Sequence, residues 1–439
     1  MLSAFIDVFR TPDLRKKVLF TLFILALFRL GSAIPTPNVN MVGVRACAAS
    51  ALEGENAGIY SMINLFSGGA MLQLTIFALG IMPYITASII LQLLTVVIPR
   101  LEKLKKEGAA GQTKITQYTR YLTLVLAVLN STTYVTMAVN GAIFQNCSSE
   151  IVYNKDVFTI IVMILTMTAG TGVIMWMGEL VTERGVGNGM SVMIFTQIAA
   201  QFPASLWGIK EQQSNEAAGW LYFALTLAVG LLVMACVIFV EQGQRRIPVQ
   251  YAKRMVGRKL IGGSTTYIPL KVNQSGVIPV IFASSLLYIP QLISQFMAGD
   301  VNPVVEWINT YLVKYDSPVY NIVYLLLIIA FCFFYVSITF NPTEIADNMK
   351  KYGGFIPGVR AGEPTARYLK YVISRLTWPG SLYLAIISLI PILAFIIFGT
   401  YQKFPFGGTS ILIIVGVGLD TVKQIQSQLQ QRNYEGFLR

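Results

Sequence analysis

Long apolar stretches separated by polar segments follow one another along the whole chain, for example at 18–27, 221–240 and 322–334. A helix rises about 1.5 Å per residue, so about 20 mostly apolar residues are needed to cross roughly 30 Å of hydrocarbon. The pattern therefore predicts an all-α polytopic membrane protein with ten transmembrane helices. The predicted spans are 18–35, 59–98 (a short broken segment followed by a full helix), 118–139, 157–177, 190–206, 219–240, 276–296, 319–340, 372–398 and 407–426.

The first predicted span follows a basic cluster of Arg15, Lys16 and Lys17. The apolar stretch after this cluster has the length of a full span. It differs from a secretory signal peptide, which has a short apolar region and a small-residue cleavage site. We therefore expect this helix to remain in the protein as an anchor.

Lysine and arginine are distributed unevenly over the two sides of these spans. With the N-terminus taken as cytoplasmic, 27 of the 33 basic residues fall in inside segments, five fall in outside segments, and Arg29 lies in the first span. Cytoplasmic loops of membrane proteins carry such an excess of Lys and Arg. The distribution predicts that both termini are cytoplasmic.

Two inside segments, 241–271 and 341–370, are large, basic and rich in Gly and Pro. One reading is an orientation signal with attraction to anionic lipid, worth about 1 kcal/mol per basic residue near the surface. Segments of this length are more often ordered and functional. Their length favours protruding docking arms for an acidic partner or for the phosphates of ribosomal RNA. Their basic residues include Arg245, Arg246, Lys253, Arg254, Arg258 and Lys259, and Lys350, Lys351, Arg360 and Arg367.

Residues 80–91 (GIMPYITASIIL) recur as residues 276–287 (GVIPVIFASSLL), with Gly, Pro, Ala and Ser in register. Chance is one explanation, because apolar helices use few residue types. The other is an internal repeat of two five-helix halves, 1–210 and 211–439. An odd number of spans per half inverts the second half, and such repeats place a pathway at their interface. Pro83 and Pro279 are predicted to kink the two repeated helices.

Composition limits the chemistry that this chain can perform. Only 12% of the residues are charged, against about 25% in soluble proteins. The chain has no histidine, which is the commonest metal ligand and general base near neutral pH. It also has no phosphate-binding loop of the GxxxxGK[ST] type, and the glycines at 185–189 are interpreted as a bend or a packing site. No enzymatic activity, metal or cofactor is predicted.

The chain has four cysteines. Cys236 and Cys332 lie in apolar stretches and are interpreted as small buried side chains. Cys47 and Cys147 fall in predicted outside loops, where a disulfide can form. The pattern leaves a disulfide and two free thiols as equal alternatives.

The segment 59–70 (IYSMINLFSGGA) is moderately apolar but interrupted by polar residues and a glycine pair. It is too short to span a bilayer. Irregular backbone at membrane depth is tolerated only inside protein or beside water. The segment is therefore either a half-helix enclosed by the bundle or an interfacial helix on the outer surface.

Motifs along the chain resemble the SecY family, the large subunit of the Sec translocon. The ordered set covers nearly the whole chain and is more specific than any single motif. It comprises NLFSGGA (64–70), IFALGIMPYITASIILQLL (76–94), GQTKITQYTRY (111–121), GELVTERGVGNGMS (178–191), GQRRIPVQYAKR (243–254), PLKVNQSGVIPVIFASS (269–285), FNPTEIADNMKKYGGFIPGVRAGEPTARYL (340–369) and FGGTSILIIVGVGLD (406–420).

This resemblance implies an hourglass pore between the two halves in a bacterial inner membrane. SecE clamps the halves, SecG is a further membrane partner, and unfolded preproteins with signal sequences are the substrates. Hydrophobic segments leave into the lipid through a lateral gate. Helices two and three form one side of this gate, and helices seven and eight form the other. A short helix at about 59–72 plugs the pore from outside; its candidate residues are Asn64, Leu65, Phe66, Ser67, Gly68 and Gly69.

The resemblance also assigns individual residues. An aliphatic pore ring falls on Ile81, Ile85, Ile194, Ile281 and Ile413, and apolar constrictions resist ions and water by dewetting. Gln92 and Asn130 are candidates for hydrogen bonds across the closed gate. The SecA motor and the ribosome are expected to compete for the arms through Arg245, Arg246, Arg258, Lys259 and Arg360. Lys259 stands where some relatives have arginine, which keeps the charge but loses bidentate geometry.

The main alternative function is that of an ion-coupled secondary transporter, because such transporters also use inverted repeats and broken helices. Transporters usually carry ionisable residues at mid-membrane. Arg29 lies within the first span, whereas Glu179, Arg375 and Asp420 lie near predicted cytoplasmic ends. This scarcity of buried charge favours the channel.

Overall fold

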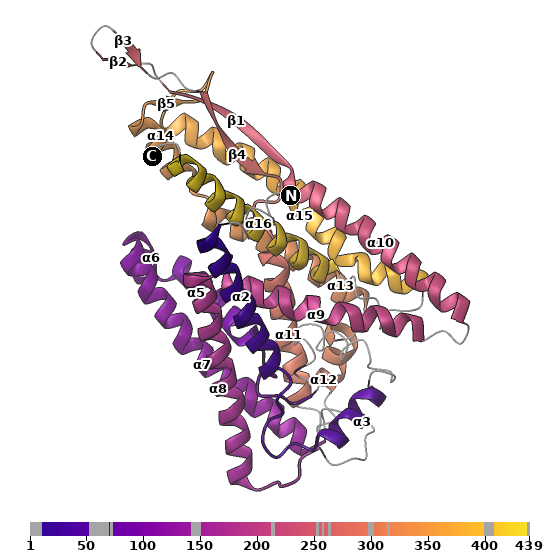
Figure 1. Cartoon of the computed structure of the whole chain (residues 1–439). Coiled ribbons are helices and arrows are strands. Elements are labelled where there is room, and N and C mark those ends of the chain that lie inside the picture. Colours follow the sequence, from indigo (N-terminus) through magenta and orange to yellow (C-terminus); the bar gives the residue numbers. More distant parts are fainter. Residues whose placement is uncertain are drawn as a thin grey trace. The chain divides into compact units, whose positions relative to one another are not determined.

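The computed structural model describes residues 11–51, 70, 73–141, 151–211, 216–251, 254–256, 259–261, 265–296, 303–313, 317–398 and 408–436 (Figure 1). The chain forms two compact units, and each is described by itself. Unit 1 comprises Met1–Leu227, Ala394–Phe406 and Ile413–Arg439, and unit 2 comprises Ala228–Leu393 and Gly407–Leu412.

A helix lies in each of the ten predicted spans, so the apolar stretches are confirmed as helices. Within the described residues, five helices are long and apolar enough to cross a membrane, and a bent pair of helices makes a sixth. The helices in the predicted spans are α2 (Pro12–Gly31), α5 (Met82–Val97), α7 (Ala109–Val139), α8 (Val157–Arg184), α9 (Gly189–Glu211), α10 (Glu216–Gln242), α11 (Ile278–Phe296), α13 (Pro318–Thr339), α15 (Glu363–Phe398) and α16 (Gly408–Gly436).

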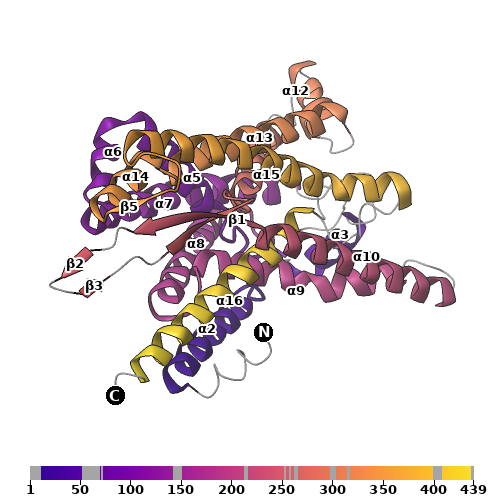
Figure 2. The same ribbon diagram turned by 90° about the horizontal axis from the view of Figure 1, so that it is seen from above.

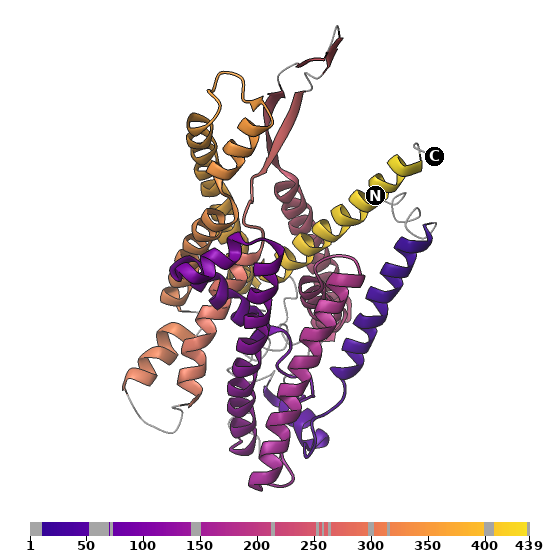
Figure 3. The ribbon, with the colours of Figure 1, turned by 90° about the vertical axis from the view of Figure 1, so that its left-hand side faces the viewer.

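In unit 1, α7 lies side by side with α8 and also packs against α5 (Figure 3). The chain turns by 100° between α5 and the short helix α6 (Pro99–Lys106). Ile98 at the turn has the extended conformation (φ −97°, ψ 112°). Because Pro99 follows, its ring disfavours the helical conformation at Ile98. The proline therefore ends α5 and directs the basic helix α6 away from it.

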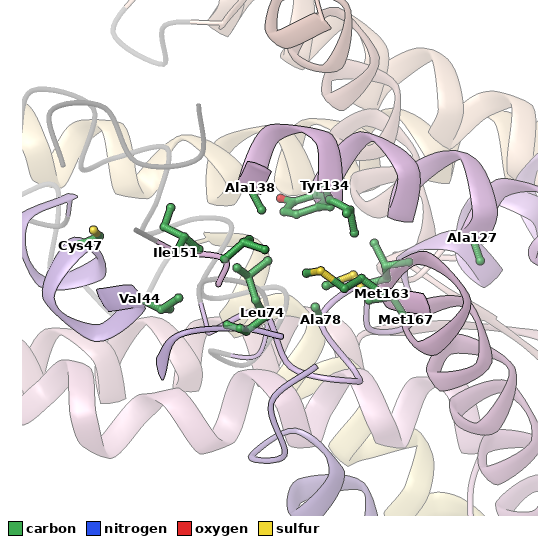
Figure 4. Close-up of a cluster of buried hydrophobic side chains, with 14 residues drawn as sticks. Val44, Cys47, Leu74, Ala78, Ala127, Tyr134, Ala138, Ile151, Met163 and Met167 are labelled. Atoms are coloured by element: carbon green, nitrogen blue, oxygen red, sulfur yellow. The ribbon is translucent and has the colours of Figure 1, made fainter. Parts of the chain in front are cut away.

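A buried apolar cluster joins four segments of unit 1 (Figure 4). The segments are α3 (Met41–Ala51) with Val39 before it, the turns before α5, α7, and α8 with Ile151 and Val152 before it. Leu74 from the turns lies near Met163 and Met167 of α8, and all three side chains are fully buried. Burying side chains of this size stabilises a fold by about 1.5–3 kcal/mol each. The cluster fixes the chain just before α5 begins.

The predicted bend at 185–189 is confirmed between α8 and α9. The backbone N–H of Val186 donates to Thr21 Oγ1 of α2 at 3.1 Å, and the N–H of Gly189 donates to Thr182 Oγ1 of α8 at 2.9 Å. A methyl group on Gly189 would overlap the carbonyl oxygen of Gly178. Glycine is needed here because the two helix ends approach each other through their backbones.

Unit 2 contains strands that the sequence analysis did not predict. In the first arm, β1 (Gln244–Tyr251) and β4 (Thr265–Lys271) form an antiparallel hairpin, with β2 (Arg254–Val256) and β3 (Lys259–Ile261) at its far end (Figures 1 and 2). Ile247 and Val249 of β1 are buried, whereas Arg246, Pro248 and Gln250 between and beside them are exposed. This alternation is the two-residue period of a strand with one covered face.

The second arm joins the first in one sheet. It contains α14 (Pro342–Lys351) and β5 (Gly354–Phe355), and the three-stranded sheet has the order β4-β1-β5. Ile247, Val249 and Leu270 from the sheet pack in one apolar cluster with Val336 of α13, Met349 of α14, and Leu369 and Val372 of α15. The remaining described elements of unit 2 are α12 (Pro303–Ile308) and the π-helix η1 (Asn309–Val313).

Candidate functional site

The internal repeat has the same local structure in both copies. Gly80 and Gly276 have positive φ angles of 56° and 61°, and α5 and α11 each begin two residues later. The backbone N–H of Ile85 donates to Ile81 O at 3.1 Å, and that of Ile281 donates to the equivalent Val277 O at 3.3 Å. A non-glycine residue is strained at such φ angles. The repeat therefore starts two helices in one way and places Ile85 and Ile281 at equivalent positions.

The prediction that Pro83 and Pro279 kink these helices is wrong. Each proline is the second residue of its helix, after Met82 and Ile278 respectively. The first four N–H groups of a helix have no partner within it, so a proline in the first turn removes no hydrogen bond. The prolines start the two helices. Pro290, by contrast, lies inside α11.

The five candidate ring residues come from four helices and the residue that precedes α5. Ile81, Ile194 of α9 and Ile413 of α16 are buried, with 2%, 9% and 1% of their surface exposed. Ile85 and Ile281 are half-buried. Four of them belong to unit 1, and Ile281 belongs to unit 2. All five side chains are aliphatic and β-branched, so none of them carries a hydrogen-bonding group; that they form one ring stays a prediction.

Helix α9 approaches the start of α5 at Gly80, the residue before Ile81. A methyl group built on Gly80 would lie 2.9 Å from Nε2 of Gln197, which follows Ile194 by one helical turn. Gln197 is 3% exposed, and its Nε2 has no hydrogen-bond partner among the described residues. Because Gly80 has no side chain, it leaves room for the polar side chain of Gln197 beside Ile81. Gln197 is not among the residues predicted from the sequence.

Gly170 of α8 sets the distance between α8 and the turns before α5. A methyl group on Gly170 would overlap the carbonyl oxygen of Ile76. Gly172, two residues later in the same helix, has only Leu124 Cδ2 within 4 Å of such a methyl group, at 3.8 Å. The two glycines therefore differ in their surroundings, while their helix is the same.

Replacing Gly170 by Ala is expected to destabilise the protein by about 1–3 kcal/mol, the usual cost of overpacking. Gly172→Ala is the matched control. It is expected to be neutral or stabilising by up to about 1 kcal/mol, because alanine favours helix over glycine. Thermal unfolding of the detergent-solubilised protein measures both. Equal melting temperatures for the two variants would contradict the close approach of α8 to Ile76.

The two gate candidates lie in unit 1. Gln92 of α5 is exposed, and its Nε2 donates to Ser88 Oγ of the same helix at 3.4 Å. Asn130 of α7 is half-buried. A hydrogen bond of either residue across a closed gate stays a prediction.

A salt bridge that the sequence analysis did not identify joins α7 to α8. Arg120 donates from Nε and Nη2 to the two carboxylate oxygens of Glu179, both at 2.8 Å. Its Nη1 donates to Gln117 Oε1 at 3.0 Å. The side chains are 39% and 19% exposed. Two parallel charge-assisted bonds fix both distance and orientation, so the pair holds the N-terminal half of α7 against the C-terminal end of α8.

The two predicted arms form one structure, because β1 pairs with β5 through Gln250–Phe355 and Tyr251–Gly354. Arg245 and Arg246 are exposed on β1. Arg360 is exposed in the turn that leads into α15, where Gly358 and Gly362 have φ angles of 83° and 103°. The carbonyl oxygen of Arg360 accepts a hydrogen bond from Thr365 Oγ1 at 2.8 Å. The backbone at Arg360 is therefore held in place, while its side chain is exposed to solvent.

Several candidates lie outside the described residues. They are the plug residues 64–69, Arg258 and Cys147; Lys259 lies on β3, but its side chain is not described. Cys47 of α3 is disulfide-bonded, whereas Cys236 and Cys332 are free thiols. Cys332 is buried as predicted, but Cys236 is exposed, so its interpretation as a buried side chain is wrong. Near Cys47, the N–H of Asn40 donates to Ile151 O at 2.8 Å, and Val39 forms a bridge with Val152. The chain before Cys47 therefore runs beside the chain that follows residue 147.

The sequence model of the SecY family matches residues 75–422. A protein translocase subunit SecY from Streptomyces galbus is 63% identical over 441 residues, covering all of both chains. The protein translocase subunit SecY of Mycobacterium tuberculosis (strain ATCC 25618 / H37Rv) is 58% identical over 446 residues, again covering both chains completely.

Three solved structures have a similar fold. A protein-conducting channel is 18% identical, with a TM-score of 0.62. A SecY protein, in which the plug domain stabilises the closed state of the channel and maintains a membrane seal, is 19% identical with a TM-score of 0.62. Sec61 in a canine ribosome–channel complex is 18% identical with a TM-score of 0.59. Each match covers 94% of this chain and 92% of the other.

Proposed function

This chain belongs to the SecY family, and we propose that it forms the protein-conducting channel through which a bacterial translocase exports unfolded chains. Full-length identity of 58–63% with translocase subunits is the observation that carries the proposal. The protein is a multi-pass membrane protein, with several helices long and apolar enough to span a bilayer. We place it in the cytoplasmic membrane with both termini inside, as the distribution of basic residues favours.

In this proposal the pore passes between the halves 1–210 and 211–439. Ile81, Ile85, Ile194, Ile281 and Ile413 form its constriction. Their aliphatic side chains disfavour water and ions in a narrow passage, but they hold no group that would bind a sliding chain tightly. The equivalent starts of α5 and α11 support the proposal, because an inverted repeat is the arrangement expected on either side of a pathway.

The segment at about 59–72 is proposed as the plug, since a SecY protein of similar fold has one. The lateral gate is proposed between α5 and α7 on one side and α11 and α13 on the other. An open gate lets a passing segment partition between pore and lipid. Each central Leu, Ile, Phe or Val favours the bilayer by about 0.3–0.6 kcal/mol, and each charge opposes it by about 2.5–3.5 kcal/mol. The free energy of partition therefore determines whether a segment is exported or inserted, and this step needs no catalytic group.

The arms are proposed to bind the ribosome and the SecA motor in competition. The exposure of Arg245, Arg246 and Arg360 supports this, as does the ribosome complex of Sec61. Arg258 and Lys259 are assigned to the same surface. SecE and SecG are the proposed membrane partners. Cys147 is the proposed partner of Cys47, which is disulfide-bonded.

Reconstitution tests the function. The chain is purified with its co-purifying membrane subunits, placed in liposomes, and supplied with SecA, ATP and a radiolabelled secretory precursor. We expect a small SecE-like protein in the preparation and protease-protected precursor in the lumen. The transporter alternative predicts instead that the chain alone drives a substrate-dependent proton flux. A proton flux of this kind, without any protease-protected precursor, would refute the proposed channel function.

A further inference from the structure

A buried chain of hydrogen bonds lies at the base of the first arm in unit 2. Glu241 is the second-last residue of α10, and its side chain is only 8% exposed. Its Oε1 accepts a hydrogen bond from Asn273 Nδ2 at 2.6 Å. Asn273 lies between the end of β4 and the start of α11 and is 2% exposed. A charge-assisted bond this short in a buried place is among the stronger polar contacts in proteins.

The chain continues from Asn273 to α13. Ser275 Oγ donates to Asn273 Oδ1 at 3.0 Å and lies 3.0 Å from Cys332 Sγ of α13. Because the Ser275 hydrogen is used on Asn273, the Cys332 thiol is the donor to Ser275. Asn273 Nδ2 also donates to Gly276 O at 3.1 Å, in the turn that starts α11. The side-chain amide of Asn273 thus joins α10 to the start of α11 and, through Ser275, to α13.

The same place is fixed to the arm and to α15. The N–H of Val272 donates to Gly243 O at 2.9 Å and closes the hairpin of β1 and β4 at its base. A methyl group built on Gly380 of α15 would lie 2.7 Å from Val272 O, so α15 contacts this turn through its backbone. The residues between β4 and α11 are therefore joined to the base of the hairpin, to α10, to α13 and to α15.

We propose that Glu241 and Asn273 are positioning residues that transmit a displacement of the arm to α11, the candidate gate helix. The arm cannot move at its base without moving residue 272, and residue 273 is tied to α10, α11 and α13 together. Packed and fully bonded polar networks of this kind have few alternative arrangements. A pull on the arm is thus carried into the first turn of α11, where Gly276 and Ile281 lie. This inference rests on the proposed docking function of the arms.

The test separates the hydrogen bond from the charge. In Glu241→Gln the amide oxygen of residue 241 can still accept from Asn273, but the charge is gone. In the double variant Glu241→Gln with Asn273→Ala the bond is lost, and no unpaired carboxylate stays buried. Ser388→Ala is the control, because Ser388 is a buried hydroxyl of α15 that donates to Ala385 O of its own helix.

Hydrogen exchange of residues 278–287 is measured in the nanodisc-embedded complex with and without bound ribosomes. In the wild type, Glu241→Gln and Ser388→Ala, we expect ribosome binding to change the exchange rate by about tenfold. In the double variant the change should fall below about twofold, while ribosome affinity stays within about twofold of the wild type. Affinity measured in the same samples separates coupling from docking.

A double variant that binds ribosomes and shows the wild-type change would overturn the coupling, as would a wild type that binds without any change. A wild type that fails to bind ribosomes overturns the docking function and the coupling with it. If the double variant does not assemble, Glu241→Met decides. It removes the acceptor that ties Asn273 to α10 and leaves no unpaired carboxylate buried, and an unchanged response in this variant contradicts the proposal.

Discussion

Replacing Arg360 by Glu is expected to slow precursor export by at least about thirtyfold, the factor that loss of a hot-spot contact of about 2 kcal/mol gives. The guanidinium is exposed in a turn whose backbone is fixed by Thr365 and two glycines of positive φ. It is therefore presented to a partner in one place. A reversed charge changes attraction to RNA phosphates or an acidic motor surface into repulsion. Protease protection of a radiolabelled precursor measures the rate.

Arg367→Glu is the matched control on the same arm. Arg367 is also exposed, and its Nη2 donates to Glu363 one turn earlier in α15 at 2.6 Å. Exposed pairs of this kind contribute at most about 1 kcal/mol, so export should stay within about threefold of the wild type. Both variants should assemble normally in the membrane. Export by Arg360→Glu at the rate of Arg367→Glu would refute a specific docking role for Arg360.

Replacing Ile85 and Ile281 together by Ser is expected to raise the ion conductance of the resting channel by about tenfold or more, since each 1.4 kcal/mol removed from a barrier gives a factor of ten. The hydroxyl groups stabilise water in a narrow passage from which the isoleucine side chains exclude it. The two residues are half-buried and equivalent in the repeat. Their replacement should therefore disturb packing less than that of the fully buried Ile81 or Ile413. Planar-bilayer recording without precursor measures the leak.

Ile161→Ser and Ile386→Ser are the controls for this leak. Both residues are exposed on membrane-crossing helices, Ile161 on α8 and Ile386 on α15. They carry the same chemical change away from the proposed constriction, so conductance should equal that of the wild type. If the variant with both Ile85→Ser and Ile281→Ser has the same resting ion conductance as these controls, the proposed seal by Ile85 and Ile281 is refuted.

The helices could be predicted because each span carries its own signal. Apolar stretches such as 221–240 satisfy the length needed to cross lipid, and α10 is found there. The repeat could also be found, because Gly80 and Gly276 are kept in register for a conformation that other residues avoid. Local chemistry was sufficient in both cases.

The arms were predicted in position but not in structure. Residues 246–250 alternate between exposed and buried side chains, and the matching alternation of polar and apolar residues in the sequence would have predicted β1. The pairing of Gln250 with Phe355 is different, because it joins residues about a hundred positions apart. No pattern within either segment specifies that contact, so the union of the two arms requires the folded structure.

The remaining errors and omissions have the same origin. Whether a proline kinks a helix depends on where the helix begins, and α5 begins one residue before Pro83. Arg120 and Glu179 are charged residues near helix ends in the sequence, and only packing of α7 on α8 brings them together. The hydrogen bond from Asn273 to Glu241 likewise joins residues separated by the whole first arm. The periodicity of residues along the chain predicts local secondary structure, but it does not predict tertiary contacts of this kind.

Site-specific photo-crosslinking to a polypeptide stalled during export tests the pore most directly. A photoreactive amino acid is placed at Ile85 or Ile281 and, in parallel, at Ile161 or Ile386. The proposed pore predicts adducts between the stalled chain and the first two positions, and lipid adducts alone from the other two. Lipid adducts from Ile85 and Ile281, with none to the stalled chain, would contradict a polypeptide path through the isoleucine ring.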